Sequence, residues 1–307
     1  MKGFIFAAGF GTRLRPLTNN FPKPLMPICN VPSILYSLLL MKEAGIRDVV
    51  CNLHYRADDI KSFFDNNDNF GMNIYFSFED TILGTGGGLK KCEHMLKDDT
   101  FLLCNSDAVF DIPVTTLLEE FYRSGGNDLL VIKKTGNAAK PVYVENGIIK
   151  DINYTFSREN NSPFTYTGMA ILTPLIFRYL EEKFSSIVYT GYTSLIENHE
   201  LSFYQHDGYW LDVGTIDAYH RVNMDVMDNI EYWQERFRGI GEVIPLIDGD
   251  DVREAEGSRV IHTVSGKGST IEQGSVVQDS VLLPGSHVPQ KAKYNRVIII
   301  DDTVIKV

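Results

Sequence analysis

The chain has 307 residues, of which 44% are hydrophobic and 22% charged, a composition typical of a globular protein with a sizeable core. Its formal net charge of −11 argues against a general binder of nucleic acid or anionic membranes, since such binders need basic surfaces. No apolar run approaches the roughly 20 residues of a membrane span, and glycines and arginines come too early for a signal peptide. We therefore expect a cytoplasmic protein with no nucleic-acid or membrane partner.

The four cysteines, at positions 29, 51, 92 and 104, agree with this compartment. No pair has C-x-x-C spacing, and Cys51 and Cys104 lie in apolar, strand-like runs. The pattern predicts buried, reduced thiols and neither a disulfide framework nor a metal site.

The first predicted element is a buried strand at residues 4–7, which runs into a glycine loop at residues 8–13. Arg13, Arg15 and Lys23 follow, whereas the first acidic side chain in the chain is Glu43. Glycines allow close backbone approach and the cations neutralise charge, so this pattern predicts a phosphate-bearing ligand.

Two common phosphate-binding motifs do not fit this loop. The chain contains no G-x-x-x-x-G-K-[ST] sequence, which excludes a P-loop. Gly9 and Gly11 have dinucleotide spacing, but Leu14 replaces the third glycine and no acidic residue follows about twenty positions on.

Strands and helices then alternate. Strands are expected at 48–53, 73–78, 101–104 and 128–133, and helices at 32–44, 57–64, from about Leu89, and at 114–123. Such alternation predicts βαβ units and a mostly parallel sheet, whose ligands bind beyond the carboxyl ends of the strands. The loop at 8–13, the glycine cluster at 84–88 and Asp107 all follow strands, so they could share one rim.

From about residue 140 the pattern changes twice. A hairpin is expected over 141–145 and 148–154, then a polar loop at 155–165, strands at 166–172 and 201–205, and helix over 216–237. Beyond Gly257, units of about six residues recur, which is typical of a hexapeptide β-helix of two or three coils. We expect a catalytic domain at 1–238 and a linker with the hexapeptide tail at 239–307.

Several side chains are candidates for chemistry, each with an ordinary structural alternative. Asp107 and Asp212 could be turn or capping residues, or could bind Mg²⁺, which prefers carboxylate oxygens. Lys23 lies between two prolines and could be a solvated loop residue or a phosphate ligand. The glycine cluster could start a helix or admit a flat base, with Glu79, Thr85 and Gly86 as contacts.

Taken together, the motifs resemble those of the sugar-1-phosphate nucleotidylyltransferases, in particular the mannose-1-phosphate guanylyltransferases and N-acetylmuramate-1-phosphate uridylyltransferases. The matching segments are G-F-G-T-R-L at 9–14, P-K-P-L at 22–25, L-G-T-G-G-G-L at 83–89, N-S-D at 105–107, Y-T-G at 166–168 and W-L-D-V-G-T at 210–215. The resemblance implies an α/β fold: a Rossmann-like, mostly parallel sheet flanked by helices, followed by a short left-handed β-helix.

The resemblance also implies roles for individual residues. Those implied to bind the nucleotide are Ala8, Gly9, Gly11, Thr12, Arg13, Glu79, Thr85 and Gly86. Arg13, Lys23 and Asp107 would be catalytic, with Lys23 at the α-phosphate, and Asp107 and Asp212 would hold Mg²⁺. Tyr166 and Gly168 would lie beside the sugar. A sugar-1-phosphate oxygen would attack the α-phosphorus of a nucleoside triphosphate and release pyrophosphate.

Two departures from the family pattern matter. Many members carry Glu-Lys-Pro after the hairpin, but the comparable stretch here is Ser157-Arg158-Glu159, so Arg158 is the candidate replacement for that lysine. Asn-Ser-Asp at 105–107 also replaces the more usual Asn-Gly-Asp.

Alternatives remain open at this stage. A catalytically silent NDP-sugar-binding paralogue would usually lose the arginine, the lysine or a metal carboxylate, and all are present here. Transfer of a nucleotide to phosphocholine would need an aromatic cage for the quaternary ammonium. This alternative stays open because of four candidate tyrosines, at positions 166, 189, 192 and 209. The nucleobase and the sugar stay unassigned, and the tail could join copies of the chain into a homo-oligomer.

Overall fold

The computed structural model describes residues 1–136, 140–156, 162–241 and 243–307. By contacts, the chain divides into two compact units: unit 1 comprises Met1–Phe10 and Tyr36–Trp210, and unit 2 comprises Gly11–Leu35 and Leu211–Val307. The predicted boundary between residues 238 and 239 stays a prediction. None of the helices in the described ranges is long and apolar enough to cross a membrane.

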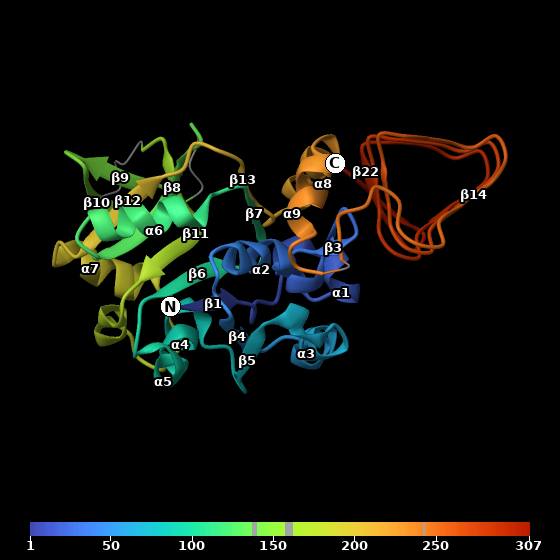
Figure 1. Cartoon of the computed structure of the whole chain (residues 1–307). Coiled ribbons are helices and arrows are strands. Elements are labelled where there is room, and N and C mark those ends of the chain that lie inside the picture. The colour runs from blue at the N-terminus through green and yellow to red at the C-terminus, as the bar shows by residue number, and fades with distance from the viewer. Residues whose placement is uncertain (137–139, 157–161, 242) are drawn as a thin grey trace. The chain divides into compact units, whose positions relative to one another are not determined.

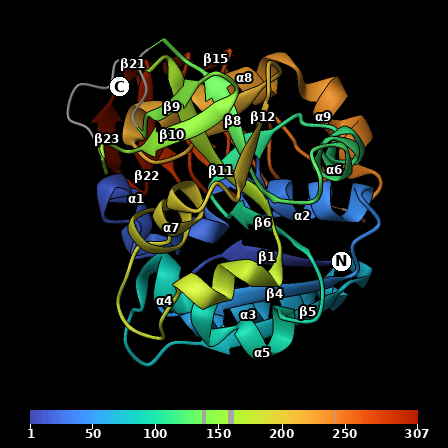
Figure 2. The ribbon, with the colours of Figure 1, turned by 90° about the vertical axis from the view of Figure 1, so that its left-hand side faces the viewer.

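Unit 1 is built on a mixed sheet, seven-stranded over the described residues, in the order β12-β8-β11-β6-β1-β4-β5 (Figures 1 and 2). Its strands are β1 (Lys2–Phe6), β4 (Asp48–Leu53), β5 (Asn73–Phe78), β6 (Phe101–Asn105), β8 (Asp128–Lys134), β11 (Phe164–Leu172) and β12 (Leu201–Gln205). The four strands β5, β4, β1 and β6 run parallel, and β11 is antiparallel to both of its neighbours. The predicted mostly parallel α/β sheet is confirmed.

The other elements assigned mainly to unit 1 are helices and short strands. The helices are α2 (Ile34–Glu43), α3 (Ala57–Asn66), α4 (Gly84–Lys91), α5 (Glu93–Leu96), α6 (Val114–Arg123) and α7 (Thr193–Glu197). The short strands are β7 (Ala108–Phe110), the hairpin β9 (Val142–Glu145) with β10 (Ile148–Ile152), and β13 (Trp210–Asp212), whose last two residues belong to unit 2. Short 3₁₀ or π turns lie at Asp68–Gly71, Pro174–Tyr179 and Val188–Tyr192.

Alternating side chains of the sheet build the core of unit 1 on both faces. On one face, Phe4 packs in a buried cluster with Leu89 of α4 and Leu195 of α7. On the other, Gly3 lies so close to α2 that a Cβ there would be 2.4 Å from the Met41 sulfur. Figures 1 and 2 show α2 and α6 on the face opposite α4 and α7. All four cysteines are buried and free, as predicted.

One helix start differs from the prediction. The helix expected from about Leu89 begins at Gly84, so the glycine cluster lies inside α4. Glycine is a poor helix former, but the packing of residues 183–187 against this turn, described below, outweighs the propensity. The helix expected over 216–237 is likewise divided at Asn229, which has φ −120°.

Unit 2 combines short loop elements, two helices and the C-terminal coils. Its first part contains the 3₁₀ turns η1 (Thr12–Leu14) and η2 (Lys23–Leu25), α1 (Leu17–Asn20), β2 (Pro27–Ile28) and β3 (Val31–Pro32). The helices α8 (Ile216–Asp228) and α9 (Ile230–Phe237) follow β13. The Tyr219 hydroxyl in α8 donates to the Pro27 carbonyl, and Asn223 accepts from the Cys29 N–H at 2.8 Å.

The tail forms three parallel coils within the described ranges. Their strands are β14 (Arg253–Glu254), β15 (Arg259–Ile261), β16 (Val264–Ser265), β17 (Thr270–Ile271), β18 (Val276–Gln278), β19 (Val281–Leu282), β20 (His287–Val288), β21 (Lys293–Asn295) and β22 (Val297–Ile300). Each strand of the first two coils pairs in parallel with the strand 17 residues further on, as Val276 does with Lys293. The last strand, β23 (Thr303–Lys306), instead pairs antiparallel with β22. The predicted β-helix is confirmed, and its left-handed sense stays a prediction.

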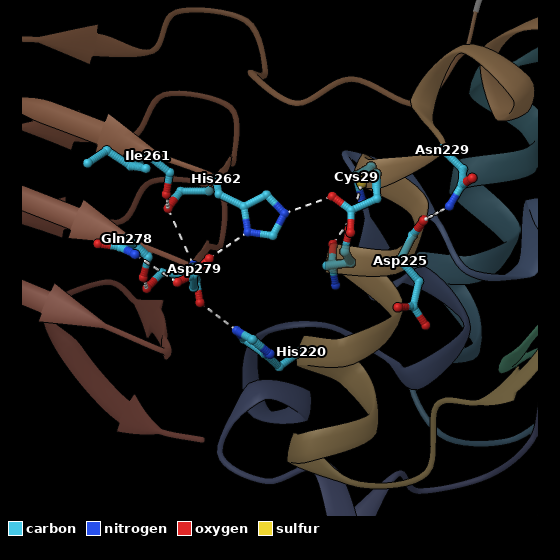
Figure 3. A network of polar contacts seen from close by, with 12 residues as sticks. Cys29, His220, Asp225, Asn229, Ile261, His262, Gln278 and Asp279 are labelled. Atoms are coloured by element: carbon cyan, nitrogen blue, oxygen red, sulfur yellow. Dashed lines mark hydrogen bonds and ion pairs between the residues drawn. The ribbon is translucent and has the colours of Figure 1, made fainter.

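A histidine attaches these coils to α8. His262 Nε2 lies 2.8 Å from Asp228 Oδ1 and its Nδ1 lies 2.6 Å from Asp279 Oδ1. His220 of α8 contacts the Asp279 carbonyl at 2.6 Å. Figure 3 shows the His262 ring pointing from the coils toward α8, with Asp279 beside it. Polar contacts therefore join the coils to the helix within unit 2.

Candidate functional site

The carboxyl ends of the parallel strands in unit 1 bring several predicted segments to one edge. Phe6 is in register with both Asn52 and Asn105 in the neighbouring strands. The segments that follow these strands, including residues 7–10 and Asp107, therefore leave the sheet at the same level. The register of these strands agrees with the predicted common rim for residues 8–10 and Asp107.

Gly168 of β11 lies against this edge. Its φ is +86°, and a Cβ built there would be 2.4 Å from Asn105 Nδ2. The register of β11 against β8 shifts between Tyr166 and Ala170, as in the bulges found at the edges of binding sites. Only glycine allows this approach of β11 to the end of β6.

The ring of Tyr166 is placed in the core. The side chain is 6% exposed, and its hydroxyl lies 2.9 Å from that of Tyr192. Burial raises the pKa of Tyr166 above its ordinary value, so the phenol stays protonated. Its sugar contact, with that of Gly168, stays a prediction.

The glycine cluster is shaped by a neighbouring chain segment. Added Cβ atoms would lie 2.4 Å from the Ser185 carbonyl oxygen at Gly84, 2.4 Å from Ser185 Oγ at Gly86 and 2.2 Å from the Lys183 carbonyl oxygen at Gly87. Thr85 Oγ1 accepts a hydrogen bond from the Ile187 N–H at 2.9 Å. Glycine is needed at these positions because residues 183–187 pack against them. This packing explains the glycines without the predicted base contact.

Glu79 follows β5 and is only 4% exposed. Its Oε1 accepts from Asn52 Nδ2 at 2.7 Å, and its Oε2 accepts from the Leu83 N–H at 2.8 Å. Its carbonyl oxygen lies 2.8 Å from His54 Nδ1. Because a carbonyl can only accept, Nδ1 is the nitrogen that donates in this hydrogen bond. The structure thus places the Glu79 carboxylate in a buried network, and a direct nucleobase contact stays a prediction.

In unit 2, Gly11 and Lys23 lie side by side. Gly11 has φ +65°, and an added Cβ would be 3.1 Å from the Lys23 Cβ and 2.9 Å from Thr18 Cγ2. Ser33 Oγ donates to the carbonyls of Lys23 and Pro24, at 3.2 Å and 3.1 Å. Flanking prolines and this serine fix the backbone that carries the lysine.

Arg13 and Asp212 lie on either side of Gly214, also within unit 2. A Cβ at Gly214 would be 3.3 Å from Arg13 Nη2 and 3.1 Å from Asp212 Oδ1. The missing side chain therefore leaves space in which an arginine and a carboxylate lie near each other. The phosphate role of Arg13 and the metal role of Asp212 stay predictions.

The two predicted metal ligands fit Mg²⁺ by their chemistry. Each offers carboxylate oxygens, and Mg²⁺ is usually held by one or two carboxylates, with water and substrate phosphates completing the shell. Across the described residues, no group of three or more His, Cys, Asp or Glu side chains could hold a metal ion. A site formed by the protein alone is therefore not seen in that part of the chain. Arg158 lies outside the described residues.

A family model described as "Nucleotidyl transferase" matches residues 2–229. The chain belongs to this family. A second model, "GlmU-like, C-terminal hexapeptide", matches residues 252–307 of the chain.

Curated relatives and a solved structure agree with the family. A mannose-1-phosphate guanyltransferase from Debaryomyces hansenii is 35% identical over 227 residues, covering 70% of this chain and 61% of that protein. One from Hypocrea jecorina is 33% identical with the same coverage. The chain thus spans about three fifths of the length of these relatives. A Bacillus anthracis structure described as a glucose-1-phosphate thymidylyltransferase, in complex with sucrose, has a TM-score of 0.67 and 23% identity, covering 74% of this chain and 96% of that chain; it shows the fold alone.

The sequence did not predict the residues that contact and position the candidate site residues. Asn52 and Ser33 carry no motif, and the packing of residues 183–187 on the glycine cluster joins positions about 100 residues apart. The four glycines at 84 and 86–88 were the one signal that something approaches α4 closely.

Proposed function

We propose that the chain is a sugar-1-phosphate nucleotidylyltransferase, which converts a nucleoside triphosphate and a sugar-1-phosphate into an NDP-sugar and pyrophosphate. The observation that carries the proposal is the family match over residues 2–229, within which Arg13, Lys23, Asp107 and Asp212 are all retained. Because the most similar relatives named above are mannose-1-phosphate guanyltransferases, GTP and mannose-1-phosphate are the first pair to test.

The reaction proposed is a direct in-line displacement. A phosphate oxygen of the sugar-1-phosphate forms a bond to the α-phosphorus, and the bond from that phosphorus to the β-phosphate bridging oxygen breaks. Such a transfer needs no protein nucleophile, so catalysis rests on positioning and charge neutralisation.

Each charged residue has its own proposed role at the phosphates. Residues 8–12 would hold the triphosphate through backbone N–H groups, and Arg13 would neutralise the charge that accumulates on the leaving pyrophosphate. Lys23, held by its prolines and Ser33, would lie at the α-phosphate. Asp107 and Asp212 would hold Mg²⁺, which when bound supplies positive charge to the phosphate oxygens.

The test is pyrophosphate release by the purified chain. ATP, GTP, UTP, CTP and dTTP are each paired with mannose-, glucose- and N-acetylglucosamine-1-phosphate and with phosphocholine, with Mg²⁺ and with EDTA. We expect Mg²⁺-dependent release with one base and one sugar phosphate, and none from Lys23→Ala under the same conditions.

Two results would overturn the proposal. Release with phosphocholine alone would identify a different acceptor class. No release with any pair, although an NDP-sugar binds, would identify a catalytically silent regulatory protein.

A further inference from the structure

Asn52 connects two of the proposed nucleotide-binding segments inside unit 1. It lies at the carboxyl end of β4 and is 2% exposed. Its Oδ1 accepts a hydrogen bond from the Ala7 N–H at 3.0 Å, where the chain leaves β1 for the glycine loop. Its Nδ2 donates to Glu79 Oε1 at 2.7 Å, beyond the end of β5. One side chain therefore joins the ends of three adjacent strands.

Glu79 extends this connection to the start of α4. Its second oxygen accepts from the N–H of Leu83, the residue that precedes the helix, at 2.8 Å. Gly88 leaves the space for this route, because a Cβ there would lie 2.6 Å from Glu79 Oε1 and 2.8 Å from Asn52 Nδ2. The network thus runs from Ala7 to the glycine cluster without leaving unit 1.

The donors at both ends fix the polarity of the network. The Ala7 N–H can only donate, so the Asn52 amide must turn its oxygen toward it and its NH₂ toward Glu79. The Leu83 N–H also can only donate. Glu79 must therefore accept at both oxygens. Neither side chain can be exchanged alone for its acid or amide counterpart without placing two donors or two acceptors face to face.

We propose that Asn52 is a positioning residue for the nucleoside triphosphate. Through Glu79 it sets the spacing between the first residues of the phosphate loop and the glycine cluster, which the sequence predicts to contact the base. It acts on nucleotide binding and leaves the sugar-1-phosphate contacts unchanged. This inference rests on the proposed function.

The test compares nucleotide binding and kinetics in variants of the full chain. We expect Asn52→Ala to raise the KM for the nucleoside triphosphate about tenfold, with the KM for the sugar-1-phosphate within about twofold of wild type. Asn52→Asp should be as impaired, because two carboxylates then face each other. The double variant Asn52→Asp/Glu79→Gln reverses only the bond between the two side chains, so that the new amide at position 79 donates to the new carboxylate at position 52, and both side chains still accept from the Ala7 and Leu83 N–H groups. It should therefore recover nucleotide binding relative to Asn52→Asp.

A matched control and an independent readout complete the design. Asn73→Ala removes an exposed strand asparagine that bonds Asp48 at the other end of β4, and should change neither KM. Equilibrium dialysis of each Mg²⁺-nucleoside triphosphate, without sugar phosphate, measures binding alone, and circular dichroism confirms folding. Should Asn52→Ala fail to fold, the comparison of Asn52→Asp with the double variant carries the test.

The outcomes separate this inference from the proposed function. A wild-type protein that binds nucleotide but releases no pyrophosphate ends the proposed function, and the binding arm still tests Asn52. Normal nucleotide binding by folded Asn52→Ala, a parallel rise in both KM values, or no recovery in the double variant overturns the inference. A wild-type protein that binds no nucleotide overturns both.

Discussion

The two units hold their proposed site residues in different ways. In unit 1, the segments at the carboxyl edge of the sheet are held by partners distant in sequence, as Asn52 holds Ala7 across 45 positions. In unit 2, Gly11 and Lys23 are held by residues no more than twelve positions away, including Thr18 and Ser33. The proposed site segments at the sheet edge thus depend on contacts that are distant in sequence, whereas the contacts described for Gly11 and Lys23 come from nearby turns.

The largest effects should come from one charged residue in each unit. We expect Lys23→Ala in unit 2 and Asp107→Asn in unit 1 each to lower turnover by about 10²-fold or more, or about 3 kcal/mol of barrier. The first variant removes a positive charge from the α-phosphate, and the second removes a carboxylate that would hold Mg²⁺. Steady-state pyrophosphate release measures both. Near-normal turnover in either variant would remove that residue from the proposed mechanism.

The buried Asp128 in unit 1 should make the stability of the folded protein depend on pH. It is fully buried, and among the described residues its Oδ2 has no hydrogen-bond partner. Burial raises its pKa from 3.8 to about 7. The folded state therefore holds this proton more tightly than the unfolded state, and stability falls as pH rises toward 7, by about 2 kcal/mol between pH 5 and pH 7.

Asp128→Asn should remove this slope, since an amide does not titrate. Urea unfolding at a series of pH values measures it, with Asp65→Asn, an exposed acid in α3, as the control that keeps the wild-type slope. An unchanged slope in Asp128→Asn would show that another group causes the pH dependence.

Gly214→Ala sharpens the comparison inside unit 2. The new methyl group would lie 3.1 Å from Asp212 Oδ1 and 3.3 Å from Arg13 Nη2, so both must shift by a few tenths of an ångström. We expect about a tenfold loss in kcat/KM, or about 1.4 kcal/mol, with little loss of stability. Gly239→Ala, whose only near contact is at 3.4 Å, is the matched control. Equal activity in the two variants would separate Gly214 from the phosphate site.

The smallest effect should come from His262, whose ring is 39% exposed. A neutral imidazole has one N–H, so only the imidazolium can donate to Asp228 and Asp279 together. These hydrogen bonds, that to Asp228 first, raise the pKa of His262 above 6.5. The stabilisation is present below pH 6.5 and is lost as pH rises through the folded pKa.

His262→Gln should therefore flatten the fall in the thermal midpoint between pH 6 and pH 8.5. His94→Gln is the control, since that ring contacts a carbonyl rather than a carboxylate. His220, Arg221 and Arg296 line the same pocket as His262 and are kept in the variant. An undiminished fall in His262→Gln would assign the dependence elsewhere.

The elements predicted most accurately from the sequence are those that a local pattern of residues determines. The strands at 48–53, 73–78 and 201–205 and the helix at 114–123 have the predicted bounds, because apolar periodicity and flanking turns define them. The family motifs led to the candidate residues of both units. Long-range packing could not be predicted: the start of α4 depends on residues 183–187, and no motif marks Asn52 as the partner of Glu79.

The reversal of β23 limits how the tail can assemble. A parallel coil leaves an open row of backbone donors and acceptors onto which a further coil could be added in the same register. Because β23 (Thr303–Lys306) covers β22 in the opposite direction, this sheet does not continue the parallel repeat. End-to-end polymerisation through that sheet is therefore disfavoured. If the tail joins copies of the chain, its lateral faces are better suited to do so than this end of the stack.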